Sequence, residues 1–203
     1  MWTTCVSGAC TEIERNPLTT PQATRVALLV GGRSAEREVS LSSGAQVKEA
    51  LVQGGYDVTV IDTGTPDFIC RLQASGVDVA FICLHGRYGE DGTVQGLCEL
   101  LDLPYVGSGV LASALAMDKV MSKHLFSWAG ISSPAYVALR RGEEFDCSAI
   151  TAALGPKTVV KPANEGSAIG VTIAHTAEEL PAAIEEAFRF DASVLVEQFV
   201  SGV

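Results

Sequence analysis

Short apolar runs that recur along the first half of the chain most constrain its fold. They cover residues 25–30, 57–62 and 77–84, and a shorter one follows at 103–106. Nearly continuous apolar strands are typical of a parallel sheet whose two faces are both covered. Helix signals lie between the runs, so the sequence predicts repeated strand–helix units. The expected class is therefore α/β, with a three-layer parallel sheet.

Apolar residues at helical spacing predict three helices between these strands. In chain order they are Gly44, Val47 and Leu51, then Phe68, Ile69 and Leu72, then Val94, Leu97, Cys98 and Leu101. Gly54 and Gly55 predict the end of the first helix.

The pattern changes after about residue 117, which predicts a domain boundary. A helix with two lysines is expected over 118–129, and strands are expected over 135–139, 157–161 and 193–200, with a polar segment between the first two strands. Thr176 and Glu179 have the spacing of a capping box for a helix running to about residue 190. The sequence thus predicts a leader over 1–24, a first domain over 25–117 and a second, α+β domain over 118–203.

Composition limits the possible functions of the chain. The net charge of −10 argues against a general nucleic-acid binder, which needs a cationic surface. No apolar run approaches the length of a membrane span, and residues 1–24 lack the apolar region of a secretory signal, so they are expected to be a flexible leader. The six cysteines form no C-x-x-C pair, which favours reduced thiols in a cytosolic protein.

Polar segments follow two of the predicted strands at the edge where α/β sheets bind ligands. In the segment 31–40, Glu36 could hold a ligand ammonium by a charge-assisted hydrogen bond. The alternative is a solvated charge cluster with Ser34 as a helix cap. In the segment 85–92, three glycines allow close approach to a ligand, and His85 with Glu90 could form an oriented pair.

A lysine at the end of a strand and a loop punctuated by glycines make up residues 161–170. A fixed cation beside exposed backbone N–H groups can hold phosphate. Lys161 and Lys119 could therefore converge on phosphate oxygens, although each lysine alone fits a solvated surface charge. The loop is no P-loop, because Gly-Lys-Ser/Thr is missing.

Three long motifs together resemble one known family. They read GGRSAEREVSLSSG, LHGRYGEDGTVQGLCELLDLPYVGSGVLASALAMDK and VVKPANEGSAIGV, in this order. From about residue 25 onward the chain resembles the D-alanine–D-alanine ligases of the ATP-grasp superfamily. The resemblance implies a Rossmann-like preATP-grasp domain followed by the first α+β subdomain of an ATP-grasp fold.

The resemblance also implies a reaction. ATP would phosphorylate the carboxylate of one D-alanine, and the amine of a second D-alanine would attack the acyl phosphate to give the dipeptide of peptidoglycan precursors. ATP, D-alanine and Mg²⁺ are the expected ligands, in a cytoplasmic protein for which a homodimer is plausible. Neither nucleic acid nor membrane is an expected partner.

Residue roles follow where the motifs match. Glu36 would bind the ammonium of the first D-alanine, and His85 would lie near its carboxylate. Lys119 and Lys161 would contact ATP phosphates, and Ser167 would orient the reacting groups.

The remaining matches concern ATP. Glu165 and Gly166 belong to the loop over the phosphates, with Ala168 replacing a serine of many relatives. Glu197 would mark the start of the adenine-side strand, where Gln198 and Val200 would offer backbone hydrogen bonds to the base.

Family members continue for roughly a hundred more residues, the size of a domain. The magnesium ligands are expected there, so no metal site is expected within 1–203. The chain alone is therefore expected to lack ligase activity, and the strand at 193–200 is expected to present an unpaired edge. Two alternatives remain: a truncated, non-catalytic module that binds D-alanine or nucleotide, and a D-alanine–D-lactate or D-alanine–D-serine ligase.

Overall fold

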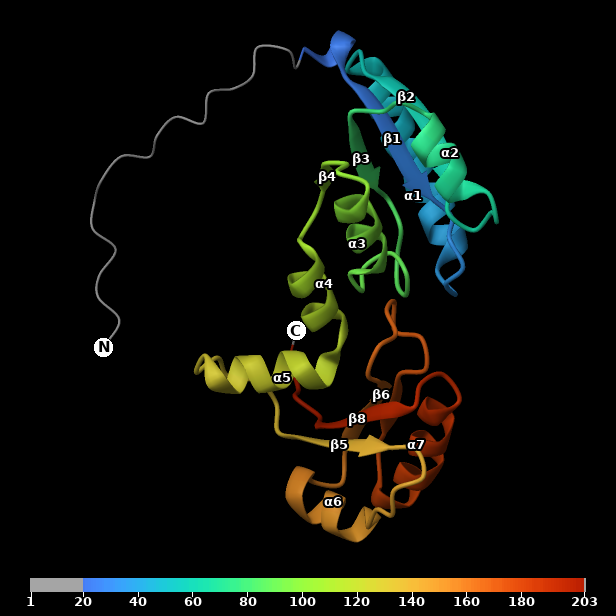
Figure 1. Cartoon of the computed structure of the whole chain (residues 1–203). Helices are drawn as coiled ribbons and strands as arrows, with labels where there is room; N and C mark the ends of the chain where they lie inside the picture. The colour runs from blue at the N-terminus through green and yellow to red at the C-terminus, as the bar shows by residue number, and fades with distance from the viewer. Residues whose placement is uncertain (1–19, 203) are drawn as a thin grey trace, which may run out of the picture.

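Two β-sheets organise residues 20–202, the part of the chain that this computed structural model describes (Figure 1). The first unit contains η1 (Pro21–Ala23), β1 (Arg25–Val30), α1 (Arg37–Gln53), β2 (Asp57–Asp62), α2 (Phe68–Ala74), β3 (Val79–Ile82), α3 (Thr93–Leu100), β4 (Tyr105–Val106) and α4 (Val110–Met117). The second contains α5 (Lys119–Trp128), β5 (Tyr136–Arg140), α6 (Cys147–Leu154), β6 (Thr158–Pro162), β7 (Thr172–Ala174), η2 (Ala177–Glu179), α7 (Leu180–Phe188) and β8 (Ser193–Gln198). Residues 1–19 of the predicted leader lie outside the described residues.

The first sheet is parallel, with the strand order β2-β1-β3-β4. Its central strand β1 sends alternate side chains to opposite faces. Leu29 belongs to a core cluster with Leu72 of α2 and Cys98 of α3, whereas Leu28 belongs to another cluster, against which Val47 of α1 packs. Helices therefore cover both faces, which confirms the predicted three-layer α/β arrangement.

The carboxyl ends of β1 and β3 are tied together by one buried serine. The Gly31 amide donates to Oγ of Ser40 at 2.8 Å, and this hydroxyl donates to the Cys83 carbonyl at 2.5 Å. Gly31 and Gly32 have φ values of 73° and 81°, which turn the chain sharply out of β1. The loops after the two strands consequently begin side by side.

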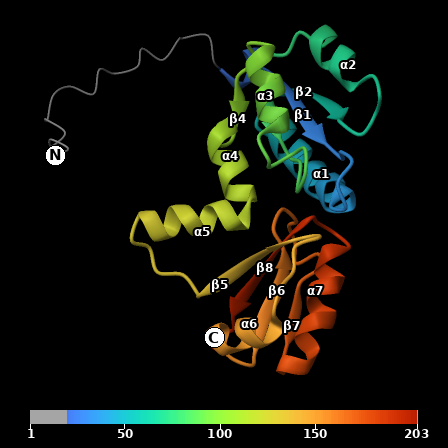
Figure 2. The same ribbon diagram turned by 60° about the horizontal axis from the view of Figure 1, so that its bottom comes forward.

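The second sheet is antiparallel, with the strand order β5-β8-β6-β7. β8 lies between β5 and β6, where Val196 is opposite Val137 on one side and Val160 on the other. The expectation that the strand at 193–200 forms an unpaired edge was wrong, because this strand inserts between two earlier ones. Figure 2 shows α6 and α7 beside this sheet, and α4 and α5 at the junction of the units.

Apart from the 3₁₀ turns η1 and η2, three elements had no counterpart among the predicted ones: α4, α6 and β7. The segment before β6 was predicted only as polar, and it contains α6. Asp146 caps this helix by accepting a hydrogen bond from the Ser148 amide at 2.8 Å. Its buried residues Ile150 and Leu154 lie four positions apart, and they join the core of the second unit.

The predicted capping box before α7 was also wrong. The Glu179 carboxylate accepts a hydrogen bond from the His175 amide at 2.8 Å, and the Thr176 side chain caps no helical N–H. A short 3₁₀ turn therefore comes first, and α7 begins at Leu180 with Pro181 in its first turn, where a missing N–H costs nothing.

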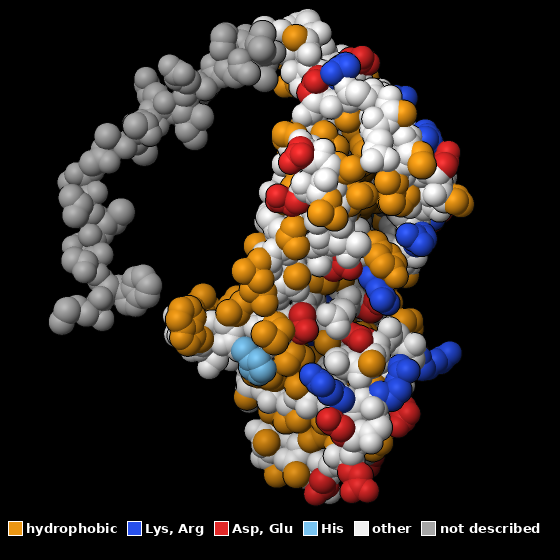
Figure 3. Space-filling model, viewed as in Figure 1, with side chains coloured by type: hydrophobic (Ala, Val, Ile, Leu, Met, Phe, Trp, Pro, Cys, Tyr) orange, Lys and Arg blue, Asp and Glu red, His pale blue; other side chains and the backbone are white. Residues whose placement is uncertain are grey.

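Apolar side chains gather at the exposed end of α5, seen at the left of Figure 3. They include Met121, Leu125, Phe126 and Trp128, the last being 88% exposed. None of the helices within residues 20–202 combines the length and the apolar character needed to span a membrane.

Candidate functional site

Glu36 lies at the start of α1, at the carboxyl edge of the parallel sheet. Glu36 is only 5% exposed. The turn that carries it is fixed by Asp62, whose carboxylate accepts hydrogen bonds from Arg37 and from the Gly32 and Gly64 amides. The Arg37 guanidinium and these amides lower the pKa of Asp62 to about 2. The sheet edge thus places one buried carboxylate in a well-anchored turn.

The second loop at this edge begins with His85. Its carbonyl accepts a hydrogen bond from Ser34 Oγ at 2.8 Å, which joins it to the turn before Glu36. The Gly86 amide donates to Glu90 Oε2 at 2.7 Å, and His85 Nδ1 lies 3.9 Å from Glu90 Oε1. His85 and Glu90 therefore face each other as the sequence suggested. The other imidazole nitrogen, Nε2, is buried and has no hydrogen-bond partner.

The loop after β6 extends from the second unit toward the first, as Figure 1 shows. Its base is fixed by Asp191, whose Oδ2 accepts hydrogen bonds from the backbone amide and the side-chain amide of Asn164, both at 2.8 Å. Ser167 and Ala168 have φ values of 47° and 60°, which are uncommon for residues other than glycine. This conformation directs the Ser167 hydroxyl toward Glu36, to which it donates a hydrogen bond.

The Glu36 carboxylate is consequently enclosed by both units. Oε1 accepts the hydrogen bond from Ser167, while Oε2 is buried without a partner. Gly86 and Gly166 both abut this carboxylate, and a Cβ atom at Gly166 would lie 2.8 Å from Oε2. The two glycines leave room for close packing around a charged group that still lacks a partner on one oxygen.

Two predicted phosphate-binding lysines lie on different elements of the second unit. Lys119 begins α5, and its ammonium donates to the Glu165 carbonyl and to the Ala163 carbonyl, the latter at 3.3 Å. Burial, followed by the positive charge of Lys161, lowers the pKa of Lys119. Lys161, on β6, forms an ion pair with Glu197 of β8.

Lys123 is a third cation beside these residues, and it was not among the predicted site residues. It is 6% exposed and pairs with the other oxygen of the Glu197 carboxylate. Burial favours a higher pKa for Glu197, but the hydrogen bonds from Lys123 and Lys161 outweigh it and lower that pKa. Lys123 and Lys161 therefore share the single negative charge of the Glu197 carboxylate.

Three predicted residues lie near the end of β8. Glu197 is the penultimate residue of this strand, so the expectation that it marks the start of a strand was wrong. The Gln198 amide donates to the Ala135 carbonyl at 2.9 Å, which commits that N–H to the sheet. Val200 follows the strand and is 65% exposed. Their predicted backbone contacts with a base stay predictions.

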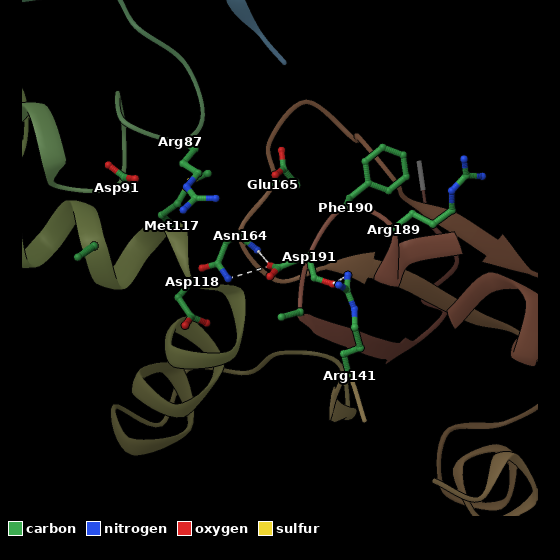
Figure 4. Close-up of a pocket in the computed structure, with 12 residues that line it drawn as sticks. Arg87, Asp91, Met117, Asp118, Arg141, Asn164, Glu165, Arg189, Phe190 and Asp191 are labelled. Carbon is green, nitrogen blue, oxygen red and sulfur yellow. Dashed lines mark hydrogen bonds between the residues drawn. The ribbon is translucent and has the colours of Figure 1, made fainter. Parts of the chain in front are cut away.

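A polar cleft of about 650 Å³ lies between the two units beside the loop (Figure 4). Arg87 lines it from the first unit, and Asn164, Glu165 and Asp191 line it from the second. Burial raises the pKa of Glu165, and the negative charges of Asp191 and Glu36 add to the effect. Residues 20–202 contain no cluster of three or more His, Cys, Asp or Glu side chains that could hold a metal ion.

Two family models match the chain. One, described as D-ala D-ala ligase N-terminus, matches residues 68–108, and one described as D-ala D-ala ligase C-terminus matches residues 125–203. The D-alanine–D-alanine ligase of Syntrophotalea carbinolica is 54% identical over 181 residues, covering 89% of this chain and 58% of the relative. That of Geobacter sulfurreducens is 52% identical over 181 residues, covering 89% of this chain and 56% of the relative.

Solved structures agree with these relatives. The crystal structure of D-alanine–D-alanine ligase from Bacillus anthracis complexed with ATP is similar with a TM-score of 0.79 and 35% identity, covering 89% of this chain and 60% of that chain. A parallel-sheet unit precedes an antiparallel-sheet unit, and the segment 161–170 begins with a lysine. Together with this match, these features define an ATP-grasp protein. Within that class, the chain belongs to the D-alanine–D-alanine ligase family. It spans less than two thirds of the length of these relatives.

Proposed function

We propose that the chain binds D-alanine through its ammonium group at Glu36 and supplies part of the nucleotide site of a D-alanine–D-alanine ligase. The Glu36 carboxylate carries the proposal, because it is buried and one of its oxygens has no partner. An unpaired buried carboxylate oxygen is costly. An ammonium group supplies both the opposite charge and the N–H donors that this oxygen lacks.

His85 supports the choice of an amino acid as ligand. Its Nε2 is buried without a partner, and the adjacent Gly86 abuts the Glu36 carboxylate. In its protonated form His85 has an N–H on both ring nitrogens, so that with Nδ1 facing Glu90 the Nε2–H can donate a hydrogen bond to a ligand carboxylate near Glu36. One acceptor for an ammonium and one donor for a carboxylate match the two ends of alanine.

Lys119 and Lys161 support the nucleotide part of the proposal. Lys161 begins the segment 161–170, and the Lys119 ammonium donates to the Glu165 carbonyl within it. Backbone amides of this segment can add further donors for phosphate. The family neighbour from Bacillus anthracis was solved with ATP, which fits this use of the lysines. Glu165, Gly166, Glu197, Gln198 and Val200 are proposed to line the same nucleotide site.

Ser167 connects the proposed D-alanine and nucleotide sites, since it lies in the segment 161–170 and donates a hydrogen bond to Glu36. We propose that Ser167 orients the D-alanine carboxylate toward the phosphoryl group of ATP that activates this carboxylate. The amine of a second D-alanine would then displace phosphate and form the dipeptide for peptidoglycan synthesis in the cytoplasm. The first relatives are longer than this chain, which covers 58% of one of them. Complete ligation is therefore proposed for a protein of their length, and substrate binding for residues 1–203.

We propose Mg²⁺ as the metal of the phosphoryl transfer in a protein of the relatives' length, and assign none of its ligands to residues 20–202. The acidic and histidine side chains of residues 20–202 form no cluster that fits a metal ion. Every role proposed for this chain thus rests on hydrogen bonds and charges of its own residues.

An NMR titration of the ¹⁵N-labelled chain with D-alanine tests the proposal. We expect shifts of the Glu36, Gly86, Gly166 and Ser167 amides, and no saturable shift with propionate, which lacks the ammonium group. Glu36→Gln should abolish D-alanine binding, whereas Glu38→Gln, on the exposed side of α1, should leave it intact. Equal responses to propionate and D-alanine, or normal binding by E36Q, would overturn it.

A further inference from the structure

Lys123 is a buried lysine that no predicted role explains. It lies on α5 with 6% of its surface exposed, although lysine is rarely buried without a partner. Its ammonium donates to the Pro134 carbonyl at 3.0 Å, lies 5.4 Å from the centre of the Tyr136 ring and pairs with Glu197 Oε1. These three contacts hold it in place from several directions.

The Glu197 carboxylate is shared between two lysines. Lys123 pairs with Oε1 from α5, and Lys161 pairs with Oε2 from β6. On β5, Tyr136 is directly opposite Glu197 in the sheet. The side chains of Lys123 and Glu197 are each 8% exposed, whereas that of Lys161 is 24% exposed. Lys161 is therefore the partner with access to a ligand.

Nucleotide binding creates a charge problem at this carboxylate. Lys161 cannot keep its contact with Glu197 unchanged while its ammonium turns to a phosphate oxygen. A buried carboxylate that loses its only cation becomes strongly unfavourable. Glu197 avoids this outcome if a second cation stays in place, and Lys123 is the one held by contacts of its own.

We propose that Lys123 is a positioning residue of the nucleotide site, which holds the Glu197 carboxylate and so lets Lys161 exchange that carboxylate for phosphate. This inference rests on the proposed function, because it assumes that Lys161 binds a nucleotide. Lys123 itself would not touch the nucleotide. Its effect passes through Glu197 and requires the positive charge of Lys123.

A purely structural Lys123 would behave differently. In that case it would only attach α5 to the second sheet, and an uncharged hydrogen-bond donor would serve nearly as well. Lys123→Gln keeps a donor for Pro134 but removes the charge, whereas Lys123→Arg keeps the charge. Lys48→Met, at an exposed position of α1, is the matched control for loss of a lysine.

Calorimetric titration with ATP forms the first test, with folding of each variant checked by thermal unfolding. We expect K123Q to weaken ATP binding by about tenfold, the size of a typical coupling between contacting charges. K123R and K48M should stay close to the wild type. In a Glu197→Gln background, K123Q should have no further effect, because the carboxylate that needs a second cation is gone. Equal losses in both backgrounds would overturn the proposal.

A second test needs no nucleotide. Carboxyl ¹³C NMR of Glu197 across a pH series should show a higher pKa in K123Q than in the wild type, and no rise in K123R. An unchanged Glu197 titration in K123Q would overturn the inference by itself. If wild-type chain binds no ATP, the nucleotide part of the proposed function fails, and the NMR series still decides whether Lys123 controls the charge of Glu197.

Discussion

The Ser167 hydroxyl of the second unit donates a hydrogen bond to Glu36 Oε1 of the first unit, across 131 positions of the sequence. Both units therefore contribute to the proposed amino-acid site. Glu36 alone would be a carboxylate at the edge of a parallel sheet, and Ser167 alone would be a loop hydroxyl. Their contact fixes one oxygen of the carboxylate and leaves the other for a ligand.

Ser167→Ala should therefore weaken D-alanine binding. The substitution leaves both Glu36 oxygens without a protein donor, so the carboxylate is less well oriented. We expect a loss of about tenfold in affinity and of about 1 kcal/mol in the free energy of unfolding. NMR titration and urea unfolding measure the two effects. Ser42→Ala, at an exposed position of α1, serves as control, and wild-type affinity in S167A would contradict the assigned role.

Gly166→Ala should impair the same site by crowding. A Cβ atom there would lie 2.8 Å from Glu36 Oε2, closer than side-chain carbons approach other atoms. We expect the loop to shift away from Glu36 and D-alanine affinity to fall by more than about tenfold. Gly96→Ala, inside α3, has room for a methyl group and should raise stability by about 0.5–1 kcal/mol. D-alanine binding by G166A as tight as that of G96A would refute the steric argument.

Asp62→Asn tests the anchor of the turn before Glu36. The folded-state pKa of Asp62 is about 2, below the ordinary value of 3.8. A lowered pKa contributes stability above the unfolded-state value, and this contribution is lost as the pH falls from about 4 toward about 2. We expect D62N to cost about 1 kcal/mol at neutral pH, since the partly exposed pair is screened by solvent.

Urea unfolding of D62N and wild type between about pH 3 and pH 7 provides the measurement. The difference should shrink toward the acid end, where the wild-type carboxylate begins to bind protons. Asp67→Asn removes an exposed carboxylate before α2 and should show no such trend. A constant difference between D62N and wild type across the series would disprove the linkage.

Glu165→Gln should not lower the stability at neutral pH, in contrast to Asp62→Asn. Burial and the charges of Asp191 and Glu36 raise the Glu165 pKa. A raised pKa means that the contribution to stability is present below the unfolded-state value and is lost as the pH rises through the folded-state value. E165Q should be at least as stable as wild type at neutral pH and less dependent on pH. Thermal unfolding beside the exposed control Glu144→Gln checks this, and a marked loss of stability at neutral pH would contradict it.

The sequence predicted those elements that depend on local patterns. The apolar run of β1 and the turn glycines after it have the predicted positions, and β2 has the predicted bounds. α6 was missed because it is short and mostly alanine, serine and threonine, so its buried Ile150 and Leu154 give only a weak helical period. The position of β8 inside its sheet depends on the order in which strands pair, which no local pattern reveals.

In the candidate site too, some residues could be predicted from the sequence and others only from the fold. Glu36, His85 and Lys161 stood out because each lies beside a strand end or a glycine-rich loop, whereas Lys119, on a predicted helix, stood out through its match to a family motif. Lys123 did not stand out, because on a predicted helix it resembled any solvated lysine. Only the fold brings it against Glu197 and buries it. Its spacing of four residues from Lys119 was the one available signal, since it places both lysines on one helical face.

ATP binding should weaken at alkaline pH, because Lys119 loses its proton there. Burial and the charge of Lys161 lower its pKa below the ordinary value of 10.5, so its ammonium loses the proton earlier than an exposed lysine does. Only the protonated form attracts phosphate, and bound phosphate in turn favours that form. ATP affinity should therefore decline as the pH rises from about 7 to about 10, with proton uptake on binding at the upper end.

Calorimetric titration in buffers of different ionisation enthalpy measures both quantities. Lys119→Arg should flatten the decline, because the guanidinium stays protonated throughout this range. Lys119→Met should weaken binding at every pH and remove the same part of the pH dependence. Lys48→Met should retain the wild-type profile, since residue 48 is exposed on the first unit. If K119R and wild type show the same decline, another group is responsible and the role of Lys119 in binding phosphate is refuted.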